Sequence, residues 1–174
     1  MSTIKVDNIT GRLDDTTINQ PITFSANTAT LNSGVVFPTG HVLQVKIVED
    51  ATAQTVNSTT YADTNLVLAI TPGSASNKIL AQWTVQADSG GNWGLSSKLI
   101  RTISSTSTAV YTSNSLYDIG FSAGRIRGSM NHLDSPNTTN EITYKVQLAS
   151  YNSIAIYAND LNSQTQLILW EIAA

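Results

Sequence analysis

The sequence has no cysteine, few charged residues and no long apolar run, and each of these features excludes a class of protein. Without cysteine the chain has no disulfide framework, no thiolate metal ligand and no cysteine nucleophile. Charged residues make up 12% of the chain, against roughly 25% in typical soluble domains. Ser, Thr, Asn and Gln supply the polar surface instead, a composition common in secreted modules and in virion or fibre proteins.

Basic residues are also scarce, with nine Lys and Arg and a net charge of -3. Nucleic-acid binding draws its affinity from clustered basic side chains, so we expect no nucleic-acid partner. No uncharged apolar run approaches the roughly 18 residues that suggest a membrane span. The first ten residues lack a basic segment followed by an apolar one, so we expect neither a classical secretion signal nor a membrane protein.

The sequence does not bring together residues for catalysis or metal binding. His41 and His132 have no partner at metal-ligand spacing. His132, Asp134 and Ser135 are the residue types of a hydrolase triad, but they lie in one short segment without a nucleophile elbow. No glycine-rich phosphate loop occurs. We therefore expect no catalytic residue, no metal site and no cofactor, and thus not an enzyme.

Apolar residues alternate in short runs separated by turn-forming residues, and no run has a helical period. This pattern predicts an all-β protein, an antiparallel β-sandwich of the jelly-roll type. The central stretch 61–87 contains two such runs, which we interpret as a β-hairpin with a type II turn at residues 71–74. Its predicted core face consists of Leu66, Leu68, Ile70, Ile79, Ala81, Trp83 and Val85.

Residues 1–39 differ from the rest, because their apolar residues form small clusters between turn formers. Such short strands are unstable alone, so we interpret this segment as an extended arm that is ordered against symmetry mates or a larger assembly. A partly disordered tail is the alternative. Residues 40–174 form the β-sandwich domain. The candidate docking residues of the arm are Ile4, Val6, Ile9, Ile18, Ile22 and Phe24.

A glycine-rich segment after the central stretch contains Asp88, Asn92 and Trp93. A tryptophan ring can stack on a sugar while Asp and Asn side chains bond its hydroxyl groups, so these residues are candidate receptor or glycan contacts. The alternative is a plain strand connection whose Trp93 packs back on the sheet.

Four segments carry a resemblance to a known group of proteins: MSTIKVDNIT at the start, YADTNLVLAITPGSASNKIL (61–80), DSPNTTNEITYKVQL (134–148) and LILWEIAA (167–174). They resemble small virion structural proteins of marine and cyanobacterial tailed phages, which are often labelled tail-fibre-like. The resemblance implies a homotrimer whose N-terminal arm docks on the particle and whose C-terminal β domain forms a knob. It also implies synthesis in the host cytoplasm and a final location in the virion.

The long fibres of that group carry repetitive shafts, and no repeat separates arm and knob here. The short arm favours a capsid decoration (cement) protein bound to the major capsid protein. A short tail fibre or tail-attached receptor-binding protein, bound to a tail protein and to a host surface glycan, is one alternative. An unrelated carbohydrate-binding module is the other.

Overall fold

The computed structural model describes residues 22–25, 28–31, 37–89, 91, 93–113, 119–121, 124–159 and 163–174. The chain divides into two compact units, residues 1–37 and 38–174, close to the boundary expected after residue 39. In the first unit, β1 (Ile22–Ser25) pairs antiparallel with β2 (Thr28–Leu31).

Strands are the only regular elements among the described residues of the second unit, as the apolar alternation predicts. No helix long and apolar enough to cross a membrane occurs in the described part of the chain. The strands are β3 (Val42–Asp50), β4 (Gln54–Val56), β5 (Ala62–Ile70), β6 (Lys78–Ser89), β7 (Trp93–Ile103), β8 (Thr106–Thr112), β9 (Ile119–Phe121), β10 (Gly124–Asp134), β11 (Ile142–Ser150), β12 (Ile156–Ala158) and β13 (Thr165–Ile172).

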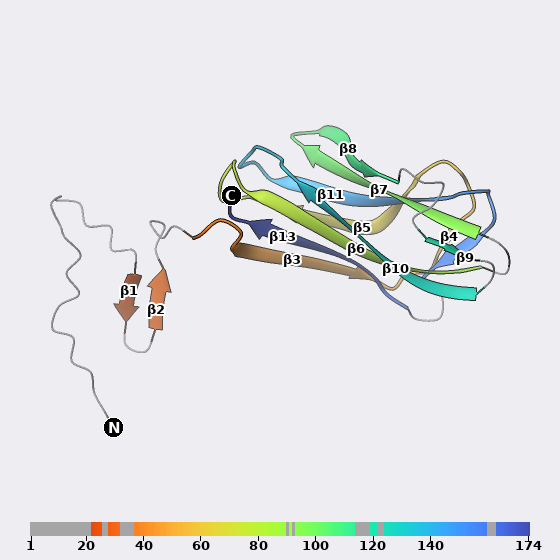
Figure 1. Cartoon of the computed structure of the whole chain (residues 1–174), viewed down its shortest axis with the longest axis horizontal. Helices are drawn as coiled ribbons and strands as arrows, with labels where there is room; N and C mark the ends of the chain where they lie inside the picture. Colours follow the sequence, from red (N-terminus) through yellow and green to blue (C-terminus); the bar gives the residue numbers. More distant parts are fainter. Residues whose placement is uncertain are drawn as a thin grey trace, which may run out of the picture. The chain divides into compact units, whose positions relative to one another are not determined.

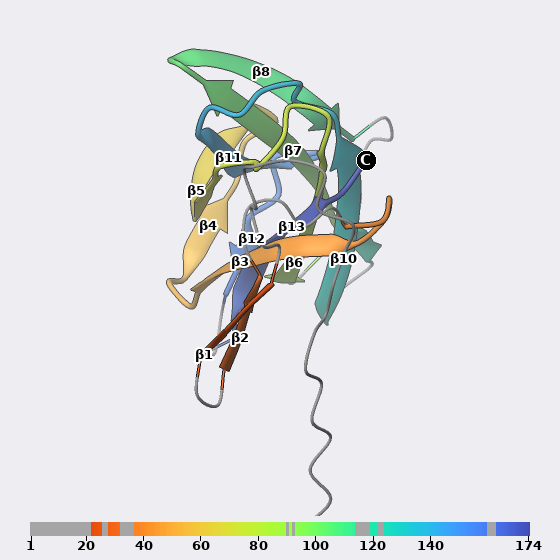
Figure 2. The same ribbon diagram turned by 90° about the vertical axis from the view of Figure 1, so that its left-hand side faces the viewer.

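The eight strands of seven or more residues form two antiparallel sheets that pack face to face (Figures 1 and 2). Sheet I has the order β3-β13-β6-β10, and sheet II has the order β5-β11-β7-β8. When the eight long strands are counted along the chain, sheet I contains the first, eighth, third and sixth, in that spatial order. Sheet II contains the second, seventh, fourth and fifth. This is the strand order of a jelly roll, so the predicted fold class is confirmed.

The inner faces of both sheets form one apolar core. The largest fully buried side chains are Trp83, Tyr144, Leu66, Ile70, Ile79, Leu95, Leu99, Ile142, Leu148, Ile156, Leu167 and Leu169. Alternation with period two explains the pattern, because every second residue of β6 and β13 points inward. The Trp83 indole N–H donates to the Ser97 hydroxyl at 3.2 Å, so even the central aromatic side chain is satisfied across the two sheets.

A partly buried ion pair also links the two sheets. Asp134 on β10 accepts hydrogen bonds from the Arg101 guanidinium on β7, at 2.8 and 2.9 Å. The Tyr144 hydroxyl on β11 donates to the same carboxylate at 2.7 Å. Burial, together with the Asp134 carboxylate, raises the pKa of Tyr144 far above its usual value, so this hydroxyl remains a donor. Asp134, Arg101 and Tyr144 together link the two sheets. Asp134 lies on β10, and its carboxylate is held by Arg101 and Tyr144.

The predicted hairpin at residues 61–87 is wrong, although its core residues are largely correct. β5 pairs with β11 in sheet II, whereas β6 pairs within sheet I, so the connection crosses from one sheet to the other. Leu68 is only partly buried; the other six predicted core residues are buried. Period two decides which side of a strand is apolar, but it does not reveal which strand is the neighbour.

The type II turn at residues 71–74 is also wrong, because Gly73 does not take a positive φ. A buried carboxylate shapes this connection instead. Glu171 accepts hydrogen bonds from the Gly73 backbone N–H at 2.7 Å and from the Asn77 side-chain amide at 2.6 Å. Its other oxygen accepts from the Gln44 side chain at 2.7 Å. The last strand of the chain therefore holds the crossover by side-chain contacts.

Candidate interaction surface

The predicted docking residues of the arm fall mostly outside the part of the chain that the structure describes. Ile4, Val6, Ile9 and Ile18 lie outside the described residues. Ile22 and Phe24 lie on β1, opposite Leu31 and Ala29 of β2. The docking role of these six residues stays a prediction.

Two of the three predicted glycan contacts, Asp88 and Trp93, lie on strands. Asp88 is the penultimate residue of β6, and Trp93 is the first residue of β7. Asn92 and the Trp93 side chain lie outside the described residues. Asp88 faces outward from sheet I and accepts from the Arg125 guanidinium at 3.3 Å. The exposed Tyr157 of β12 lies opposite Asp88 on its other side.

A continuous row of apolar side chains crosses the outer face of sheet I. Residues directly opposite one another in a ladder project to the same face, so the register identifies neighbours. Trp170 lies opposite Val45 and Leu80 on its two flanking strands. Leu80 in turn lies opposite Leu133 of β10. Because the adjacent Leu169 is fully buried in the core, this row points away from it.

Two more apolar pairs flank this row. Ile47 lies opposite Ile168, and Val42 lies opposite Ile172. We call the combined surface the apolar patch: Val42, Val45, Ile47, Leu80, Leu133, Ile168, Trp170 and Ile172. Seven large apolar side chains are exposed in the described part of the chain, and four of them, Val42, Val45, Ile47 and Leu133, belong to the patch with exposed fractions of 42 to 55%. The patch therefore gathers most of this exposure on one face.

Sequence reasoning missed the patch, although a signal exists in the last strand. Residues 167–170 read Leu-Ile-Leu-Trp, without the polar residues that alternate in a half-solvated strand. Leu167 and Leu169 fill the core, and the two residues that follow them lie on the outer face. A strand that is apolar on both sides is typical of sheets that are covered on both faces.

The other end of the same face is polar. Asp88 pairs with Arg125 there. Arg127 lies on the same side of β10 and donates to the Gln164 carbonyl at 3.1 Å. The Gln166 side chain donates to the Glu49 carboxylate at 2.8 Å. The outer face of sheet I thus has an apolar half and a polar half along its strands.

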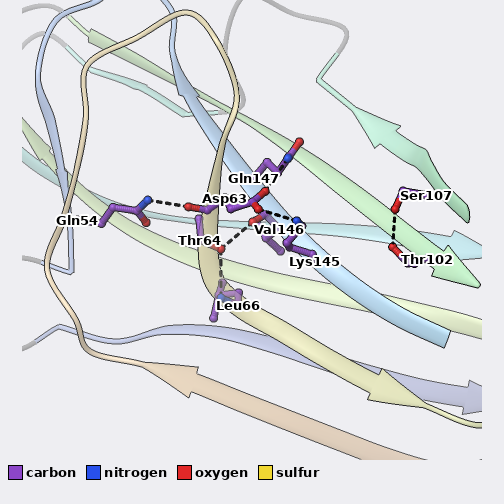
Figure 3. Close-up of polar contacts among 9 residues, drawn as sticks. All are labelled: Gln54, Asp63, Thr64, Leu66, Thr102, Ser107, Lys145, Val146 and Gln147. Carbon is purple, nitrogen blue, oxygen red and sulfur yellow. Dashed lines mark hydrogen bonds and ion pairs between the residues drawn. The ribbon is translucent and has the colours of Figure 1, made fainter. Parts of the chain in front are cut away.

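Polar side chains on the outer face of sheet II bond one another (Figure 3). Asp63 on β5 accepts from the Lys145 ammonium at 2.6 Å and from the Gln147 amide at 2.7 Å. The Gln147 hydrogen bond and the Lys145 contacts lower the pKa of Asp63. Farther along the sheet, the hydroxyls of Thr102 and Ser107 lie 2.8 Å apart in a hydrogen bond (Figure 3).

The described residues hold no group of three or more His, Asp or Glu side chains that could bind a metal ion. His132 packs beside Tyr111, with ring centroids 6.1 Å apart.

No protein-family model matches the chain. No curated protein matches it in sequence. Among solved structures, a chain in the "Structure of infectious bursal disease virus Gx strain" is similar to it, with a TM-score of 0.43 and 15% sequence identity over 88% of this chain and 42% of that chain. The chain thus spans less than half of that structural neighbour's length.

Proposed function

We propose that this protein is a structural component of a phage particle, most simply a homotrimeric capsid decoration protein. Residues 1–39 attach it to the particle, and the jelly roll forms an exposed knob. The observation that carries the proposal is the apolar patch on sheet I. A contiguous exposed apolar surface of this kind marks a protein–protein contact rather than a free solvent face.

The composition and the sequence resemblance support the same proposal. A weakly charged, hydroxyl-rich chain suits extensive packing against other subunits, and the resemblance to virion proteins of tailed phages covers both the arm and the knob. Jelly rolls serve in viral capsids and in lectins. Because a fold does not specify a function, this last point agrees with the proposal without deciding it.

A test of the location is the number of copies per purified virion, measured by quantitative mass spectrometry against the major capsid protein. A decoration protein is present in hundreds of copies. A count of a few trimers would instead place the protein on the tail. Absence from purified particles would overturn the structural role altogether.

A test of the arm is deletion of residues 1–39. We expect the shortened protein to give the circular dichroism spectrum of a folded β protein and to fail to bind particles that lack the full-length protein. A truncated knob that still decorates particles would contradict the docking role of Ile4, Val6, Ile9, Ile18, Ile22 and Phe24.

A receptor-binding role on the tail is the second candidate. Tyr157, Asp88 and Arg125 lie side by side at the polar end of sheet I, where an exposed aromatic ring stands next to charged groups. Such an arrangement can contact a sugar. Tyr157→Ala should then weaken glycan binding by about 1 to 3 kcal/mol on a glycan array and in titration calorimetry. Unchanged binding would exclude this ring as the contact.

A further inference from the structure

We propose that the outer face of sheet I binds the same face of a second copy of this chain about a two-fold axis. The inference deepens the proposed function, on which it rests for the larger assembly, by naming a surface at which copies meet. The apolar patch forms the centre of this contact, and the polar residues beyond it form the rim. Interfaces commonly have this arrangement of an apolar centre and a polar rim.

The distribution of exposed apolar residues favours a two-fold contact. A ring contact needs two different complementary surfaces on each copy, whereas a two-fold contact uses one surface twice. The other exposed large apolar side chains of the described residues are Val67, Tyr151 and Tyr157. Val67 lies on the outer face of sheet II, Tyr151 in a turn, and Tyr157 next to Asp88. They do not form a second patch for the first to bind.

The area of the outer face of sheet I also matches the area that a stable dimer interface buries on each partner. Strands lie about 4.8 Å apart and rise about 3.3 Å per residue. Four strands, of which β6 has 12 residues, therefore present a face on the order of 700 Å². A stable interface buries roughly 800 Å² on each partner. The patch alone is smaller than this, so the polar half must take part in the contact.

Charge indicates the relative direction of the two copies. Lys78 is the exposed residue opposite Ile172, at one end of the patch, and Glu49 lies beyond Ile47 on the other side. A two-fold axis across the strands makes them antiparallel between copies and moves each lysine toward the end that carries Glu49 of the second copy. An axis along the strands would instead bring the two Lys78 side chains to the same end, whereas the opposite end carries both signs, with Asp88 and Glu49 near Arg125 and Arg127.

The contact uses the face of sheet I rather than its edge. β3 is an edge strand, since its one strand partner among the described residues is β13. Lys46 in its middle lies opposite Leu169, and Leu169 is buried, so this lysine projects to the inner side. An inward-pointing charge on an edge strand opposes the addition of another strand. The exposed Val45 and Ile47 lie on the outer face, where that charge does not interfere.

Together with a trimer held by the arm, this contact joins neighbouring trimers. Each trimer would have three knobs, and each knob would pair with a knob of another trimer. Two trimers that pair all three knobs with each other form a hexamer, and association adds stability to every member by mass action.

The test is sedimentation velocity of the full-length protein over a wide concentration range. The double variant Ile47→Glu with Leu133→Glu has one glutamate on each side of the apolar patch and so places charge in the proposed contact. We expect the wild type to form hexamers if the arm trimerises and dimers if it does not. The double variant should have half the mass of the wild type in either case.

The matched control is Val67→Glu with Tyr151→Glu, two exposed apolar residues of similar exposure, 43% and 41%, outside the patch. Its mass should equal that of the wild type. Circular dichroism verifies folding, and Ile47→Thr with Leu133→Ser replaces the glutamates if these unfold the chain. Equal masses for wild type and patch variant, or an odd-numbered wild-type oligomer, would overturn the proposal.

The two proposals fail in different ways. A protein that dimerises through the patch but is absent from purified virions would overturn the structural role and leave the face contact intact. A protein that is abundant on virions, and whose mass the patch variant does not change, would overturn the face contact alone.

Discussion

The two outer faces of the jelly roll differ in chemistry, although both belong to antiparallel sheets with four long strands each. On sheet II, Asp63 is held by Lys145 and Gln147, and neighbouring hydroxyls bond each other (Figure 3). On sheet I, an apolar row runs through Trp170 and Leu80 across all four strands. The first face has one exposed large apolar side chain among the described residues, Val67, whereas four such side chains gather on the second.

The difference shows that folding and association use different apolar residues. The core lies between the sheets, so neither outer face is required to fill it. Burying apolar surface is worth about 25 cal/mol per Å², and the patch leaves that free energy available for a partner. A polar outer face gains little from being covered, because its groups would lose water and already have partners.

The largest effect on stability should come from the Asp134–Arg101 ion pair, which lies between the two sheets. Asp134→Ala leaves the partly buried Arg101 guanidinium without its carboxylate and the buried Tyr144 hydroxyl without its acceptor, so we expect the free energy of unfolding to fall by roughly 3 kcal/mol. The control is Asp88→Ala, which breaks the exposed pair with Arg125 on the face of sheet I and should cost less than about 1 kcal/mol. Urea unfolding of both variants measures the two values. Equal losses would show that the inner link is no stronger than a surface pair.

A smaller effect should follow from the turn between β7 and β8, which joins two strands of sheet II away from the patch. Ser104 and Ser105 have φ values of 46° and 72°, a left-handed pair that fits a type I′ turn. Asn and Gly favour these angles, so Ser104→Asn with Ser105→Gly should raise the free energy of unfolding by about 0.5 to 1 kcal/mol. Self-association should not change.

The matched control for this turn is Ser107→Gly, a strand position two residues on. Glycine there should lower stability by at least about 0.5 to 1 kcal/mol, because it loses more conformational freedom on folding and because the Thr102 hydroxyl loses its partner. A loss of stability in the turn variant would indicate that the serines do not form the turn in solution.

The smallest effect concerns pH and the polar face. The pKa of Asp63 is lower in the folded state than its usual value of 3.8. Its contribution to stability is therefore complete above that value and is lost as the pH falls through the folded pKa. Because the pair is solvent-exposed, the loss should stay below about 1 kcal/mol. Urea unfolding at pH 7 and near pH 3 should show a smaller difference for Asp63→Asn than for the wild type.

The sequence predicted the strands well where one side is apolar and the other polar. The two apolar runs of residues 61–87 form β5 and β6, and six of their seven predicted core residues are buried. It failed where a long-range contact decides the structure. The crossover between β5 and β6 depends on Glu171, almost one hundred residues away in the chain, and no local pattern around Gly73 reveals that carboxylate.

The candidate site was harder to predict than the fold. Asp88 was singled out for a loop and lies on a strand beside Arg125. The patch was missed because its members come from four strands and become neighbours only through the register of sheet I. Each strand by itself carries one or a few outward apolar residues, which is common on protein surfaces.

The sequence by itself determined an all-β chain, a separate N-terminal segment and most of the core, because period-two alternation and turn residues act within a few positions. Tertiary structure alone decided which strands are neighbours and which apolar side chains meet on one outer face. Pairing in a jelly roll joins strands that are distant in the chain, such as β3 with β13 and β6 with β10, so these contacts exist only once the two sheets have formed.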